Sequence, residues 1–147
     1  TMTYQTITLT VPENLYKRLE TQARAAARSV EEVAARALTR SLPPPVEADL
    51  PPALRAELKA MSHLSDETLW QIADSTMNPD KVALHEVLLE RNQSGALTPE
   101  GRQWLTRLRE EADALMLRKA HAYVLLQSRG HKLPSLEELH SRLRVLH

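Results

Sequence analysis

One short segment near the N-terminus restricts the fold more than any other part of this 147-residue chain. Residues 5–11 (QTITLTV) alternate polar and apolar side chains, and five of the seven are β-branched, which is typical of a half-buried β-strand. A single strand has no partner within its own module, and unpaired backbone groups are unfavourable. We therefore expect a second copy to complete a two-stranded antiparallel ribbon, with Ile7, Leu9 and Val11 against the helices and the threonines toward solvent.

Two short helices are predicted after this segment. Pro12 ends the strand pattern and opens a helix in which Leu15, Leu19 and Ala23 recur every four residues, so they share one face. Ser29 and Glu32 have the spacing of a capping box at the start of the next helix. The turn between the helices contains Ala27 where a glycine is usual, so we expect a strained or differently shaped turn.

A proline-rich stretch separates this region from the rest of the chain. Residues 43–52 hold five of the nine prolines, and proline fixes φ and removes a backbone donor. The sequence thus predicts a first domain over residues 2–42, a linker over 43–52 and a second domain over 53–147.

The second domain is predicted to be entirely helical. Helix-start signals occur at Pro52, Ser65, Asn78-Pro79, Thr98-Pro99 and Ser135. The helix opened by Thr98 has no proline until Pro134 and is expected to continue to Arg129, which makes it one long helix. Its apolar stripe and the caps indicate a module that folds by itself. The expected fold class is mainly α, with one strand and two helices in an intertwined dimer followed by an all-α module.

Composition and motifs argue against an enzyme. The chain has no cysteine and a formal net charge of zero. It also lacks a glycine-rich phosphate loop, a Gly-x-Ser-x-Gly motif and an HExxH motif, so we expect no metal, no cofactor and no catalytic residue. The six histidines are expected to be solvated or capping, and Trp70 and Trp104 are expected to be core anchors. Neither a membrane span nor a secretion signal is apparent, so a cytoplasmic protein is expected.

The N-terminal region resembles the ribbon-helix-helix family, which includes Arc-like and CopG-like repressors and bacterial antitoxins. The resemblance covers about 40 residues, from Thr6-Ile-Thr-Leu-Thr-Val-Pro through Arg28-Ser-Val-Glu-Glu-Val-Ala to Leu42. It implies a ribbon in the DNA major groove whose outward residues touch base edges. These residues are Thr6, Thr8 and Thr10.

The resemblance also implies phosphate contacts and a dimer core. The phosphate-contacting residues would be Lys17, Arg18, Arg28, Ser29 and Val30. The dimer core would contain Ile7, Leu9, Val11, Leu15, Leu19, Val33 and Ala37.

The function expected from these features is that of a homodimeric DNA-binding protein, an antitoxin-like or autoregulatory repressor. Its helical module would bind a partner protein, a toxin or another protein. The alternative is a protein-interaction or assembly module that does not bind DNA and uses the ribbon only to dimerise.

Overall fold

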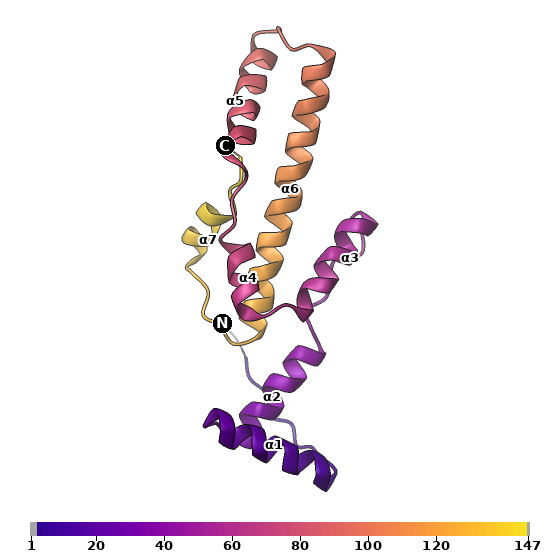
Figure 1. The fold of residues 1–147 in the computed structure, drawn as a ribbon, viewed down its shortest axis with the longest axis vertical. Helices are drawn as coiled ribbons and strands as arrows, with labels where there is room; N and C mark the ends of the chain where they lie inside the picture. Colours follow the sequence, from indigo (N-terminus) through magenta and orange to yellow (C-terminus); the bar gives the residue numbers. More distant parts are fainter. Residues whose placement is uncertain (1–2, 147) are drawn as a thin grey trace. The chain divides into compact units, whose positions relative to one another are not determined.

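The computed structural model describes residues 3–146 and divides the chain into two compact units, residues 1–42 and residues 43–147 (Figure 1). Met2, where the predicted first domain begins, and His147 lie outside the described residues.

The predicted N-terminal strand is absent from the described chain, and the expectation of a ribbon-helix-helix fold with one strand is wrong. Residues 3–12 have no regular secondary structure, and all described elements are helical. The alternating pattern of residues 5–11 reflects β propensity, but a strand also needs a neighbouring backbone that accepts and donates its hydrogen bonds. Residues 5–11 make no backbone hydrogen bond to any other residue in 3–146.

The rest of the N-terminal unit is a pair of packed helices, α1 (Glu13–Ala26) and α2 (Val30–Ser41). Pro12 precedes α1, and the Ser29 hydroxyl oxygen accepts the Glu32 backbone N–H at 3.1 Å at the start of α2. The turn between the helices is strained as expected, because Ala27 has φ 53° and ψ 45°, a left-handed conformation that clashes with a Cβ atom.

The C-terminal unit begins with the proline-rich stretch. Val46 and Leu50 pack against the hydrophobic core of this unit, and a guanidinium nitrogen of Arg55 donates to the Ala48 carbonyl at 2.9 Å. Helix α3 (Pro52–Ala60), the 3-10 turn η1 (Met61–His63) and helix α4 (Asp66–Ala73) follow. The proline-rich stretch therefore packs against the C-terminal unit and is part of it.

Helix α6 (Pro99–Ser128) is the axis of the C-terminal unit. Its 30 residues correspond to about 45 Å at 1.5 Å per residue, and it contacts α3, α4, α5 (Pro79–Gln93) and α7 (Leu136–Leu143). The predicted long helix is thus present. Ser65, Asn78, Thr98 and Ser135 all accept a backbone N–H at the start of their helices, as the sequence predicts.

Two hydrophobic clusters lie along α6. The first is formed with α3, η1 and α4, and its largest fully buried side chains are Leu69, Leu125 and Leu126. The second is formed with α5 around Leu88, Leu105 and Leu108. The chain after α7 returns to this second cluster, where Val145 and Leu146 pack against it.

Candidate functional site

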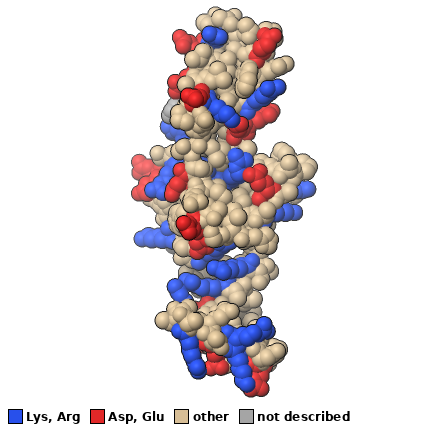
Figure 2. Space-filling model, viewed as in Figure 1, with Lys and Arg blue, Asp and Glu red and all other residues tan. Residues whose placement is uncertain are grey.

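The α1–α2 pair carries a groove lined by basic side chains. Its volume is about 340 Å³, and its lining residues are Gln22, Ala26, Arg28, Val33, Arg36, Ala37 and Arg40. Arg36 and Arg40 are one helical turn apart on α2, which places them on the same helix face. Arg28 lies in the connection between α1 and α2. Figure 2 shows several Lys and Arg side chains over α1 and α2 on the face it presents, with some Asp and Glu side chains among them.

The charge in this groove is only partly neutralised. An Arg28 guanidinium nitrogen lies 3.5 Å from a Glu32 carboxylate oxygen, and both side chains are solvent-exposed, so the pair is weak. Arg36 and Arg40 are exposed and have no ion pair within residues 3–146. Guanidinium groups bind phosphate with two parallel hydrogen bonds, so the groove can hold an anionic backbone.

The structure groups the predicted phosphate-contacting residues differently from the sequence. Arg28 lines the groove, and Ser29 and Val30 lie beside it at the start of α2. Lys17 and Arg18 lie on α1 outside the groove lining, and Lys17 pairs with Glu13 at 3.4 Å. The sequence analysis missed Arg36 and Arg40, although their spacing on one predicted helix was the available signal.

The predicted base-contacting threonines Thr6, Thr8 and Thr10 are all exposed. They lie on the irregular segment before α1, where no ladder fixes the direction in which they project. The structure therefore leaves them accessible, but it does not hold them in the register that base reading requires.

Of the seven predicted dimer-core residues, three are exposed within the chain, three are half-buried and one is buried. Val33 is buried, Val11, Leu15 and Leu19 are half-buried, and Ala37 is exposed. Ile7 is 74% exposed and Leu9 is 55% exposed. The unit also exposes Tyr16, Leu38 and Leu42, so its apolar surface exceeds what its own two helices can bury.

A second cavity lies in the C-terminal unit, and the sequence analysis did not find it. It occupies about 320 Å³ between α5, α6 and residues 145–146, and His85, Arg109 and Asp113 are its polar lining residues. His85 is only 4% exposed, so the expectation of a solvated or capping histidine is wrong. Burial lowers the pKa of His85, the nearby charge of Arg109 lowers it further, and Glu86 opposes these effects.

The basic end of α6 has a structural role. Arg129 donates to the carbonyls of Ser62 and Leu64 and to the Asp66 carboxylate, at 2.7 to 2.9 Å. A ring nitrogen of His131 lies 2.7 Å from the other Asp66 oxygen. These contacts tie the end of α6 to the start of α4, so the basic side chains are not a free binding patch.

The two tryptophans differ in their surroundings. Trp70 packs edge-on against Tyr123 and His131, with ring centroids 6.3 Å and 5.9 Å away. Trp104 is 48% exposed, and the Arg107 guanidinium carbon lies 5.6 Å from its ring centroid. Trp70 is a core anchor as expected, whereas Trp104 is not.

Within residues 3–146 no group of three or more His, Cys, Asp or Glu side chains is arranged to hold a metal ion. Over the same residues, no helix combines the length and apolar character that a bilayer crossing requires. Comparison with protein-family models gave no match, and comparisons with curated proteins and with solved structures gave none either.

Proposed function

We propose that this chain is a homodimeric protein that binds double-stranded DNA through its N-terminal unit and regulates transcription, as a repressor or an antitoxin-like protein. The observation that carries the proposal is the groove on α1 and α2, in which Arg28, Arg36 and Arg40 face one space. The folded C-terminal unit is then the module that meets a protein partner.

The dimer is inferred from burial. The only buried hydrophobic side chains described in residues 3–42 are Ala23 and Val33, and units this small seldom bury enough apolar surface to fold alone. Ile7 and Leu9 are mostly exposed, and covering them would be favourable by about 25 cal/mol per Å². A second copy of the same unit supplies a matching apolar surface, and contact between the two surfaces does not require a strand.

The anionic partner is inferred from charge. Residues 1–42 hold six basic and four acidic side chains, and three of the basic ones line the groove. Dimerisation doubles the number of groove arginines, which raises the affinity for a polymer of phosphates. Because Thr6, Thr8 and Thr10 are not held in a ladder, phosphate contacts carry the binding, and we expect weak sequence preference.

A second candidate function is an assembly module that dimerises without binding DNA. Two ion pairs in the N-terminal unit favour it: Glu13 lies 3.4 Å from Lys17, and Glu32 lies 3.5 Å from Arg28. Such pairs reduce the positive field around the unit.

Fluorescence anisotropy of a labelled DNA duplex at low salt separates the two functions. We expect the full chain to bind and the double variant Arg36→Gln, Arg40→Gln to bind at least about tenfold more weakly, because four arginines are lost per dimer. The matched control is Arg91→Gln with Arg102→Gln, since both are exposed arginines of the C-terminal unit. No binding by the parent chain, or equal loss in both double variants, contradicts DNA binding by the groove.

A further inference from the structure

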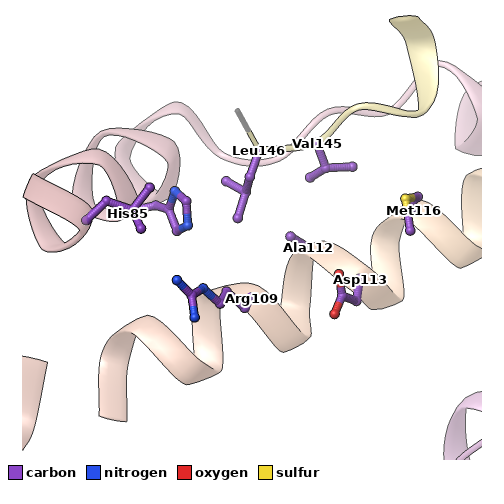
Figure 3. Close-up of a pocket in the computed structure, with 8 residues that line it drawn as sticks. His85, Arg109, Ala112, Asp113, Met116, Val145 and Leu146 are labelled. Atoms are coloured by element: carbon purple, nitrogen blue, oxygen red, sulfur yellow. The ribbon is translucent and has the colours of Figure 1, made fainter. Parts of the chain in front are cut away.

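The cavity of the C-terminal unit has a mixed lining. Its apolar lining residues are Leu89, Ala112, Met116, Val145 and Leu146. Figure 3 shows the segment that carries Val145 and Leu146 opposite α6, with Ala112 and Met116 on the facing side of that helix. At about 320 Å³ the cavity is at the small end of the range for small-molecule sites, which are mostly apolar with a few converging polar groups.

His85 is the buried polar group of this cavity. It is 4% exposed, its ring is directed toward Arg109 and Leu146 in Figure 3, and no residue in 3–146 is its hydrogen-bond partner. Among the described residues, the one fully sealed side-chain polar atom without a hydrogen-bond partner is the Tyr123 hydroxyl oxygen, so the His85 ring nitrogens keep access to the cavity. A ligand in the cavity can therefore accept or donate a hydrogen bond at this ring.

Arg109 adds a positive charge at the same end of the cavity. Its guanidinium group lies near the His85 ring in Figure 3, and none of the ion pairs in the described residues includes it. Arg109 lowers the pKa of His85, in addition to the larger effect of burial, so the imidazole is neutral near pH 7 and keeps one N–H donor. This end therefore offers a guanidinium group and an imidazole N–H to an acceptor.

Asp113 is the one acidic side chain in the lining, and it is separated from this end. It follows Arg109 by one helical turn, and Figure 3 shows it farther along α6, beyond Ala112. Asp113 forms no ion pair with Arg109 in the described residues, and it is not among the charges that shift the pKa of His85, which are those of Arg109 and Glu86. The cavity thus has a cationic donor end and a longer apolar remainder.

We propose that this cavity binds a small aliphatic carboxylate, whose acid group meets Arg109 and His85 and whose hydrocarbon tail lies against Leu89, Met116 and Leu146. Charge-assisted hydrogen bonds to the carboxylate satisfy both side chains. The apolar wall then gives affinity through burial of the tail. This proposal is independent of DNA binding, because every lining residue belongs to the C-terminal unit.

Titration calorimetry with hexanoate, acetate and 1-hexanol tests the proposal on the full chain. Hexanoate should bind, whereas acetate, which lacks the tail, and hexanol, which lacks the charge, should bind at least about tenfold more weakly. Arg109→Gln should weaken hexanoate binding about tenfold or more, while Arg102→Gln, an exposed arginine two turns earlier on α6, should leave it unchanged. Because both arginines are exposed, neither change threatens the fold.

Nuclear magnetic resonance locates the binding. Hexanoate should shift the signals of the His85 ring and the Met116 methyl group and leave those of His63 and His140 unchanged. Equal affinity for hexanol, or shifts that are absent at His85 and Met116, would overturn the carboxylate site. Binding that survives Arg109→Gln would overturn it as well.

Discussion

A guanidinium nitrogen of Arg129 lies 2.7 Å from a carboxylate oxygen of Asp66, which joins the residue after α6 to the first turn of α4. The Arg129 side chain is 9% exposed, whereas that of Asp66 is 36% exposed. The same guanidinium group also satisfies the carbonyl oxygens of Ser62 and Leu64. Arg129 therefore holds the C-terminal end of α6 against η1 and the start of α4, beside the first hydrophobic cluster.

Replacing Arg129 with methionine should destabilise the C-terminal unit strongly. The change keeps an apolar stem but leaves one Asp66 carboxylate oxygen and two partly buried carbonyls without their donor, while His131 still contacts the other Asp66 oxygen, and the loss is expected to cost about 3 kcal/mol. The free energy of unfolding from urea denaturation measures this loss. The control is Lys81→Met, because Lys81 and Glu111 form a pair at 2.8 Å whose side chains are both nearly half exposed. It should cost no more than about 1 kcal/mol, and equal losses would show that Arg129 has no special role.

The pKa of His85 should lie below the usual value of 6.5, because burial and the charge of Arg109 both disfavour the imidazolium ion. Arg109→Gln should raise this pKa only in part, since burial is the larger cause and remains. A pH titration of the His85 ring signals by nuclear magnetic resonance measures both values. A pKa at or above 6.5 in the parent chain would contradict the burial of this ring.

The same shift has a consequence for stability. The unfolded chain takes up a proton at His85 near pH 6.5, before the folded chain does, so the stability associated with the neutral ring is complete above pH 6.5. It declines as the pH falls through the lower folded pKa. His85→Leu should therefore weaken the fall in unfolding free energy below pH 6.5, whereas His63→Leu, at an exposed histidine, should not.

The sequence predicted the helices better than the sites, and the reason is the range over which each signal acts. A helix start depends on a few neighbouring residues, so Ser65, Asn78 and Thr98 were sufficient to place α4, α5 and α6. A strand needs a partner elsewhere, and the pattern of residues 5–11 contained no information about one. The strand prediction failed for that reason.

The two cavities show the same limit. Arg36 and Arg40 share a helix face that the sequence periodicity indicates, so the basic groove is predictable from the spacing of the charges on this helix. His85 is different, because its burial arises where α5, α6 and residues 145–146 meet. The residues next to His85 in the sequence therefore do not predict that its side chain is buried.

Ala27→Gly should stabilise the N-terminal unit. Ala27 has φ 53°, and relief of the left-handed strain is expected to be worth about 1 kcal/mol. Thermal unfolding followed by circular dichroism measures the gain. The control Ala35→Gly lies at an exposed position in the interior of α2, where glycine should instead destabilise by about 1 kcal/mol. A loss of stability in Ala27→Gly would show that the left-handed turn is not strained.

Leu9→Asp should dissociate the proposed dimer. Leu9 is 55% exposed in the single chain, and a carboxylate at this position would be buried without a partner in the interface. Analytical ultracentrifugation at micromolar concentration should give a dimer for the parent chain and a monomer for this variant. Thr8→Asp places the same charge one residue earlier at an exposed polar position, and it should leave the dimer intact. Monomeric parent protein would contradict the dimer.

The salt dependence of DNA binding tests the central claim most directly. Each phosphate neutralised by the protein contributes about −0.9 to the slope of log K against log salt concentration. If the three groove arginines of each copy all contact phosphates, the parent chain should have a slope of about −5. The Arg36→Gln, Arg40→Gln variant should reduce the steepness by about 3 to 4. A slope that the two substitutions leave unchanged, or no binding of the parent chain even at low salt, would contradict the assignment of the α1–α2 groove as a DNA-binding surface.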